Sequence, residues 1–402
     1  MRFFETGYRY MRPQLNRSNP ALLMRIAVYG VLVLAAAYWL WSGTVAEADW
    51  QSEWPKTNFG KHTVPLEEIR SGGPSKDGIP PVDRPRFIAS EEAARWLDAQ
   101  EPVIVFERKG DARAYPLQIL MFHEIVNDTV GGVPVAVTFC PLCNASIVFN
   151  RRVDGLVLDF GTTGKLRKSD LVMYDRQTES WWQQFTGTGI VGKHAGTVLE
   201  QLPSTIASFV DFRKAYPAGH VLSRETGFTR PYGRNPYRGY DRIGDTPFLF
   251  SDPVDPRLPA MERVLGVQQG RSVRIYPFTV LASARIVNDR VDSEPVAVFT
   301  AEGMLSALDA EVIRDSRRIP AAAAYSRRLG ERTLSFELRG ERIVDRETGS
   351  EWDLFGRSVA GALKGQRLTP VDSGVHFAFA WLAFNPQSEI YAPDRSAART
   401  GK

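Results

Sequence analysis

Two cysteines are the residues of this chain whose type and spacing most clearly suggest chemistry. Cys140 and Cys143 are the only cysteines in the 402 residues, and a proline and a leucine separate them. The pair lies between two β-branched runs, residues 133–139 and 145–149, whereas redox pairs of the thioredoxin type begin a helix that lowers the thiol pKa. Asn144 follows, and asparagine tolerates a left-handed backbone. We predict a β-turn knuckle like those of zinc ribbons, whose amides favour thiolate.

Histidine is the natural source of further ligands, because one knuckle provides only half of a closed tetrahedral site. His123 precedes the turn that leads into the cysteine strand, so it is the best candidate for a ligand or proton donor. Met173 and His194 could complete a nitrogen and sulfur ligand set that copper accepts. Met173 lies in an apolar strand, where methionine more often belongs to the core. Copper, zinc and iron remain open as the metal.

The sequence allows three interpretations of the cysteine pair. Cys140 and Cys143 could be a redox dithiol or metal ligands, with His123 acting beside them. In an exported protein they could instead form a structural disulfide, and the protein would be a non-catalytic module that binds an envelope ligand or partner. A bridge that closes so short a loop constrains little of the unfolded chain and would be strained and reducible. This favours redox chemistry over a structural role.

Three aspartates near the cysteine pair could act as general acids or bases. They are Asp159, Asp170 and Asp175. Such residues more often cap turns. Asp175 also recurs as Asp345 in a later segment that lacks cysteines, so we interpret these aspartates as structural.

Segments of the chain recur at nearly constant distances, which indicates an internal duplication. In the second copy, alanine, alanine and methionine stand where His123, Cys140 and Cys143 would fall. Residues that work together at one site are expected to be lost together, as these three are. The matching segments are Tyr115-Pro116 with Tyr276-Pro277, residues 125–128 with 286–289, 134–137 with 295–298, 175–182 with 345–352, Phe212 with Trp381, and Pro217 with Pro386.

Short strands and turns dominate both copies, and helices are few and short, so we predict a β-rich α+β fold of two pseudo-symmetric repeats. Residues 230–240, in the loop between the repeats, contain arginine, tyrosine, proline and glycine without a core pattern. This loop is either a tether or a lid whose tyrosines and arginines reach the site. The expected segments are a basic segment 1–25, a membrane helix 26–46, a linker or wrapping segment 47–86, a first repeat 87–223 with the cysteine site, an inter-repeat loop 224–262, a degenerate second repeat 263–392 and a tail 393–402.

All of the net positive charge belongs to the N-terminus. Residues 1–25 carry five arginines and one glutamate, which accounts for the net charge of +4. A nucleic-acid footprint would need a basic face on the folded part, so we expect no nucleic-acid partner. Residues 26–46 carry no charge, and a helix of this length would span roughly 31 Å, close to the hydrocarbon thickness. Tyr38, Trp39 and Trp41 lie near its far end, where aromatic side chains prefer the interface.

These features predict a single-pass anchor in the cytoplasmic (inner) membrane, with the arginines on the cytoplasmic side. The alternative is a cleaved signal peptide with Ala46-Glu47-Ala48 as its cleavage site. Either arrangement places the folded part outside the cytoplasm, in the periplasm of a bacterium with two membranes. The expected partners are the lipid bilayer and an unidentified redox or envelope protein.

Two long motifs resemble the family known as domain of unknown function 3179. They are Phe122-His-Glu-Ile-Val-Asn-Asp-Thr-Val-Gly-Gly-Val-Pro-Val-Ala-Val-Thr-Phe-Cys-Pro-Leu-Cys143 and Ser169-Asp-Leu-Val-Met-Tyr-Asp-Arg176, and the similarity covers about residues 79–392. The resemblance implies an exported prokaryotic protein without a settled activity. Some members are selenoproteins, which implies redox chemistry at the cysteine positions. The chain has Asn144 where glycine is usual and Phe122 where tryptophan is common, but neither change removes a candidate ligand.

Overall fold

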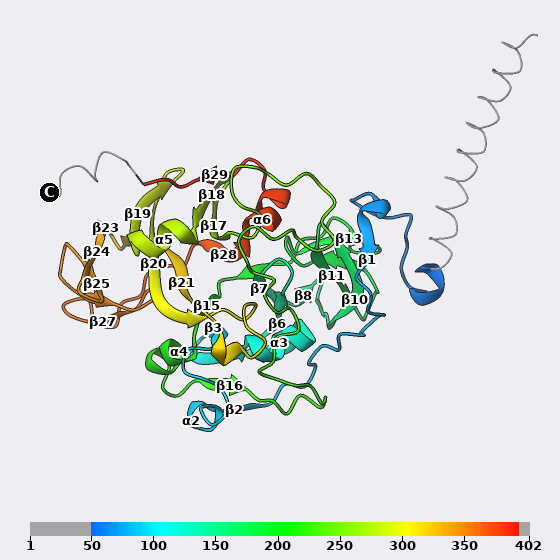
Figure 1. The fold of residues 1–402 in the computed structure, drawn as a ribbon, viewed down its shortest axis with the longest axis horizontal. Coiled ribbons are helices and arrows are strands. Elements are labelled where there is room, and N and C mark those ends of the chain that lie inside the picture. The colour runs from blue at the N-terminus through cyan, green and yellow to red at the C-terminus, as the bar shows by residue number, and fades with distance from the viewer. Residues whose placement is uncertain (1–49, 394–402) are drawn as a thin grey trace, which may run out of the picture. The chain divides into compact units, whose positions relative to one another are not determined.

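Short, mainly antiparallel strands are the dominant secondary structure of residues 50–393, the part of the chain that this computed structural model describes (Figure 1). The predicted β-rich fold with few short helices is therefore confirmed. The predicted basic segment 1–25 and membrane helix 26–46 lie outside the described residues. Among the residues that are described, no helix combines the length and the apolar character needed to cross a membrane.

Three larger sheets and the two-stranded β8-β9 hairpin form the N-terminal half of the folded part, which we define as residues 87–223. One has the strand order β15-β3-β4-β16-β2, the second β14-β7-β6-β5, and the third β1-β10-β11-β12-β13, whose β1 comes from the preceding segment. The bounds are β1 Ile69–Ser71, β2 Phe87–Ala89, β3 Pro102–Arg108, β4 Asp111–Pro116, β5 Ile125–Val130, β6 Val133–Cys140, β7 Ala145–Asn150, β8 Arg152–Val153, β9 Leu156–Val157, β10 Phe160–Arg167, β11 Asp170–Asp175, β12 Trp181–Gln183, β13 Thr188–Val191, β14 Gln201–Leu202, β15 Thr205–Ser208 and β16 His220–Leu222.

The C-terminal half, residues 263–392, repeats the order of the strands that the two halves share, and its sheets lack counterparts of β1, β2 and β14. They run β28-β17-β18-β29, β19-β20-β21 and β24-β25-β26-β27. In both halves the first sheet contains one parallel pair, β16 with β4 and β29 with β18. The bounds are β17 Arg263–Gln269, β18 Ser272–Pro277, β19 Ile286–Val291, β20 Glu294–Leu305, β21 Arg318–Ser326, β22 Arg328–Leu329, β23 Arg332–Thr333, β24 Phe336–Arg339, β25 Arg342–Asp345, β26 Glu351–Trp352, β27 Ser358–Ala360, β28 Asp372–Phe377 and β29 Glu389–Ile390.

Short helices occupy corresponding places in the two halves. Two follow a proline N-cap and end at a residue with left-handed backbone, Glu124 (φ 57°) in the first half and Arg285 (φ 55°) in the second. The helices are α2 Ser90–Ala93, α3 Leu117–His123, α4 Phe209–Ala215, α5 Phe278–Ala284 and α6 Ala378–Phe384, with 3-10 turns η1 Leu66–Glu68 and η2 Ile313–Asp315.

One buried polar network also occurs twice. Arg113 donates through Nη1 to both carboxylate oxygens of Asp128 at 2.8 Å, and the Tyr115 hydroxyl donates to the same carboxylate at 2.6 Å. The same contacts recur 161 residues later, between Arg274, Tyr276 and Asp289. A buried charge that is paired and hydrogen-bonded stabilises the fold without needing any ligand. We therefore take networks present in both halves as structural.

The segment before the first half wraps against its strands, which is the wrapping alternative for residues 47–86. β1 pairs with β10 (Figure 1), and the backbone N–H of Asp77 donates to the Thr162 carbonyl at 2.9 Å. Val82 forms a parallel bridge with Val126. These backbone bonds position one wall of the cavity described below.

The two halves pack directly against each other within one compact unit that begins at Lys56. The N–H of Phe377 donates to the carbonyl of Cys143 at 2.9 Å, so a strand of the C-terminal half holds the backbone of the cysteine turn. Phe185 stacks on Phe384 with ring centroids 4.5 Å apart. The C-terminal half is thus part of the framework that supports the first half.

The two halves differ in the sizes of two residues at a contact between a helix and a strand. A Cβ at Gly266 in β17 would overlap the indole of Trp381 in α6. The corresponding residues of the first half are the buried Val105 in β3 and Phe212 in α4, a larger strand residue facing a smaller ring. Close packing of interiors requires this compensation.

Replacing Gly266 by valine is expected to lower the free energy of unfolding by about 1–3 kcal/mol, because the added methyl groups overpack the indole. The double variant Gly266→Val/Trp381→Phe reproduces the pair of the first half and should recover part of the loss. Urea denaturation of both variants tests the expectation. Equal losses in the single and double variants would contradict it.

Candidate functional site

The cysteines lie in a tight turn between two paired strands. β6 ends at Cys140, which pairs with Ala145 at the start of β7. The N–H of Asn144 donates to the Pro141 carbonyl at 3.2 Å, and Asn144 has a left-handed φ of 48°. The predicted knuckle and the role of Asn144 in it are confirmed. Both thiols are free and no more than 1% exposed.

Asp170 meets the two sulfurs inside the protein. Ligand atoms of Cys140, Cys143 and Asp170 all lie within 4.8 Å of one another. The Oδ2 atom of Asp170 accepts from Gln183 Nε2 at 2.6 Å and from the Phe185 N–H at 2.9 Å. Its Oδ1 atom has no hydrogen-bond partner. One oxygen is therefore fixed by the fold, and the other is available to a ligand.

A two-residue hairpin turn places Asp170 beside the sulfurs. Arg167 at the end of β10 pairs with Asp170 at the start of β11, so Lys168 and Ser169 form the turn. Both turn residues have positive φ, 53° and 65°, as the favoured hairpin turns require. The turn also directs the Ser169 carbonyl to the thiols, which donate to it across 3.4 Å from Cys143 and 3.9 Å from Cys140.

The site gathers acidic groups without a compensating cation. Burial raises the pKa of Asp170 to about 7. Burial and the nearby charge of Asp170 raise the pKa of Glu124 to about 8. Among residues 50–393 neither carboxyl has an ion-pair partner. Burial also raises the pKa of both thiols, that of Cys143 well above its usual value. The backbone N–H of Cys143 lowers the pKa of Cys140, as predicted for a turn amide, but burial outweighs it.

His123 is engaged away from this group. Its Nδ1 lies 2.7 Å from the Pro80 carbonyl and its Nε2 lies 2.6 Å from the Tyr232 hydroxyl. The ring also packs against Phe228, with centroids 5.5 Å apart. Both nitrogens already have partners, so the structure brings the two cysteines together with Asp170 and leaves His123 in a separate hydrogen-bonded contact.

The other two predicted metal ligands also lie elsewhere. Met173 is fully buried in β11 within the hydrophobic core. His194 has its Nδ1 3.6 Å from a carboxylate oxygen of Asp154 and its ring beside Trp182, with centroids 5.6 Å apart. Neither belongs to the group of ligand atoms around Cys140 and Cys143. The copper-type set of methionine and histidine ligands is not gathered in this structure.

Sequence reasoning named Asp170 as a possible general acid or base but favoured a structural role for it, and it did not single out Glu124, although the repeat carried a signal for both. At the offset of 170, Asp170 corresponds to Gly340, and at the offset of 161, Glu124 corresponds to Arg285. The test applied to the cysteines would therefore have found these carboxyls. The same comparison indicates a structural role for Asp175. Its carboxylate accepts from the Thr178 N–H at 2.6 Å and from Trp182 Nε1 at 3.0 Å. The same bonds recur at Asp345, Thr348 and Trp352.

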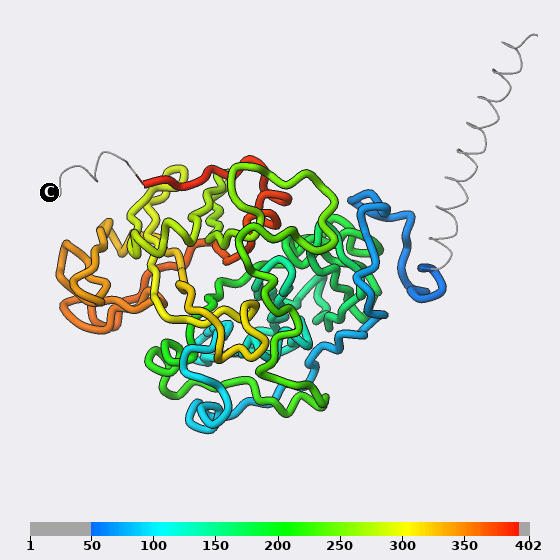
Figure 2. The backbone as a smooth tube through the Cα atoms, in the orientation of Figure 1, coloured from blue at the N-terminus to red at the C-terminus, as the bar shows by residue number. Residues whose placement is uncertain are grey.

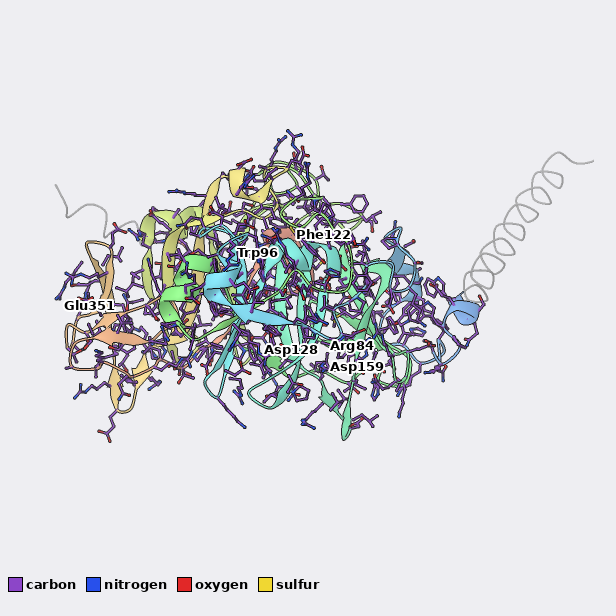
Figure 3. The ribbon with its side chains drawn as sticks, turned by 90° about the horizontal axis from the view of Figure 1, so that it is seen from below. Arg84, Trp96, Phe122, Asp128, Asp159 and Glu351 are labelled. Atoms are coloured by element: carbon purple, nitrogen blue, oxygen red, sulfur yellow. The ribbon has the colours of Figure 1, made fainter. Side chains whose placement is uncertain are left out.

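Asp159 has a structural partner as well. Its Oδ1 accepts from Arg151 Nη1 at 2.5 Å, and Arg151 Nη2 donates to the backbone carbonyl of Asp128 at 3.1 Å. Figure 3 shows Asp128 and Asp159 near each other in the lower middle of the view, with Glu351 of the C-terminal half at the left. Asp159 is about half exposed and serves this ion pair, as interpreted from the sequence.

The loop between the halves lies over the site. It contains neither helix nor strand, and Figure 2 shows it as a long light-green stretch across the middle of the view. Burial and then the nearby charges of Glu124 and Cys140 raise the pKa of Tyr237. Burial and the nearby charges of both cysteines also raise the pKa of Tyr240. Arg234 and Arg238 instead pair with Glu311 of the C-terminal half. The tyrosines thus reach the site, and these arginines attach the loop to the second half.

The comparisons with known proteins agree with the resemblance of the motifs. The family model described as "Protein of unknown function (DUF3179)" matches residues 76–388, which include the cysteine turn, Asp170 and most of the C-terminal half. No curated protein and no solved structure matches the chain. The chain therefore belongs to the DUF3179 family of proteins of unknown function.

Proposed function

We propose that this protein is a metalloprotein that binds one transition-metal ion through Cys140, Cys143 and Asp170. The observation that supports it is the clustering of three buried ligand atoms within 4.8 Å of one another. Zinc bonds of about 2.3 Å to sulfur and about 2.1 Å to oxygen place tetrahedral ligand atoms roughly 3.5–3.8 Å apart. Small side-chain rotations would bring the three atoms to those separations.

The charge of the site supports a cation as the missing partner. Two thiols, Asp170 and Glu124 share a buried region in which no described residue forms an ion pair with either carboxyl. Buried charges are normally paired or coordinate a metal. Loss of the thiol protons would also leave the Ser169 carbonyl facing two anionic sulfurs at 3.4 and 3.9 Å, an unfavourable contact unless a cation lies between them.

The donor set selects among metals. Two thiolates with one carboxylate suit Zn²⁺ or Fe²⁺, whereas Cu⁺ prefers thiolate, thioether and imidazole ligands without oxygen. Three protein ligands leave a fourth position for an additional donor. Of the metals left open by the sequence, we therefore propose zinc or iron.

We also propose that the two halves derive from one duplicated unit, and that the second lost the site and remained as a support. The repeated sheet orders and buried networks support the duplication, while Ala301, Met304 and Gly340 replace the three ligands. The charge pattern of residues 1–46 supports an anchor in the cytoplasmic membrane with the folded part outside.

Elemental analysis of the full chain, expressed with export and purified in detergent, tests the metal proposal. We expect about one zinc or iron per chain, which a chelator removes. Protein that contains neither metal and takes up no Zn²⁺ after reduction would overturn the proposal.

A thiol redox function is the second candidate, and the contact between Asp170 and both sulfurs favours it. A buried carboxyl could accept a thiol proton while the dithiol transfers two electrons and two protons to a disulfide of an exported partner protein. The burial of both sulfurs and their raised pKa oppose direct exchange with such a partner. A metal-free protein whose pair cycles between dithiol and disulfide would favour this candidate.

A further inference from the structure

A cavity of about 610 Å³ adjoins the cysteine site, a volume typical of small-molecule pockets. Leu142, which lies between the two cysteines, and Leu171, which follows Asp170, are both in its wall. Other parts of the wall come from the wrapping segment and from the loop between the halves, including Tyr240 and Leu249. The cavity therefore shares the two turns that carry the proposed metal ligands.

The wall is mainly apolar, with a few polar groups. Glu124, Tyr237 and Tyr240 supply carboxyl and hydroxyl groups among leucine, isoleucine and phenylalanine side chains. Lys165 also lies in the wall, but its ammonium lies over the Trp181 ring, 5.5 Å from the centroid. Few polar groups in an apolar wall fix the orientation of a ligand and select its hydrogen-bonding atoms.

Exposed apolar side chains concentrate at the same loop. Five of the nine large apolar side chains that are exposed among the described residues fall between positions 228 and 254. Phe248 is 50% exposed and Leu249 is 37% exposed, and both also line the cavity. Exposed apolar groups at a concave site mark a place where an apolar ligand enters.

We propose that this cavity binds a neutral, mainly apolar small molecule that carries a hydrogen-bond acceptor, such as a quinone or a lipid ester. The apolar wall takes the body of the molecule, and the hydroxyl and carboxyl groups of the wall bind its acceptor. Binding in the cavity requires only the geometry above, whereas a role for the ligand beside the metal rests on the proposed function.

Thermal unfolding of the full chain in detergent tests the ligand class. The probes are duroquinone, methyl dodecanoate and dodecane, and the last has no acceptor. We expect one of the first two to raise the unfolding temperature by roughly 3–5 °C near saturation, and dodecane to raise it less. The acceptor-bearing probe with the larger shift identifies the source, quinone or lipid. No shift with any probe, or an equal shift with dodecane, overturns the proposal.

Leu249→Asp and Val359→Asp form a matched pair for locating the binding. Both replace an exposed apolar residue by a carboxylate, but Val359 lies outside the cavity wall. Leu249 has a left-handed φ of 50°, which aspartate tolerates better than leucine, so Leu249→Asp should fold. We expect Leu249→Asp to lose the thermal shift and Val359→Asp to keep it. Equal shifts in the two variants would place the binding elsewhere and overturn the proposal.

Measurements with and without zinc test the cavity and the metal centre separately. The thermal shifts are measured with zinc-loaded and with chelated protein, and zinc is quantified in both variants. A shift that depends on Leu249 in protein unable to bind zinc would retain the cavity and reject the metal centre. Zinc binding without any ligand shift would retain the metal centre and reject the cavity.

Discussion

Asp170→Asn is expected to lower the affinity for Zn²⁺ by at least about 100-fold while the metal-free protein stays folded. The variant removes an anionic ligand. Even replacing a residue that only hydrogen-bonds to a ligand typically lowers the metal affinity 10–100-fold. Its side-chain oxygen can still accept from Gln183 and from the Phe185 N–H, so the local hydrogen bonds remain. Competition with a chromophoric chelator measures the affinity.

Two further variants make this measurement specific to the site. Cys143→Ser should lose affinity to a similar or greater extent, because a hydroxyl at this position is a much weaker zinc ligand than thiolate. Asp159→Asn removes a carboxylate of the first half that pairs with Arg151 outside the cluster, and it should bind zinc like the wild type. If all three variants bound zinc with wild-type affinity, Cys140, Cys143 and Asp170 would not be its ligands.

Metal-free protein is expected to lose several kcal/mol of unfolding free energy as the pH rises from about 4 to about 8. The folded-state pKa is about 7 for Asp170 and about 8 for Glu124, against usual values of 3.8 and 4.5. In this window the folded state holds protons that the unfolded state has released, so the free energy of unfolding falls with pH. Each pKa unit of difference corresponds to about 1.4 kcal/mol.

Urea denaturation at several pH values tests this expectation by difference. Asp170→Asn and Glu124→Gln keep the shape of the side chains but cannot ionise, so each should be more stable than the wild type at pH 8 and show a flatter pH profile. Zinc should restore the wild type at pH 8, because the ligand that binds the folded state stabilises it. The raised pKa values would be contradicted if the unfolding free energy of the wild type, compared with that of both variants, did not fall between about pH 4 and about pH 8.

The repeated networks give these predictions an internal reference. Arg113 with Asp128, and Asp175 with Trp182, keep their partners in the C-terminal half, where no cysteine exists. Their replacement should reduce stability without a specific effect on metal affinity. The ligands proposed here have no counterparts in that half, so their replacement should affect binding first.

The sequence by itself determined the local features of this protein. The β-branched runs at 133–139 and 145–149 with Asn144 between them predicted the knuckle, because strand propensity and left-handed tolerance act within a few residues. The self-comparison also identified which residues the second half lacks, since a duplicated chain carries its own record of substitutions.

Only the tertiary structure decided which side chains meet the sulfurs. Asp170 lies 27 positions beyond Cys143 and reaches it through the pairing of β10 with β11 and a turn at residues 168–169, whereas His123, nearer in the sequence, is bound by Pro80 and Tyr232. Sequence proximity does not fix a direction in space, because a side chain follows the register and the face of its strand. The cavity wall likewise needs several segments far apart in the chain, and only their packing brings them together.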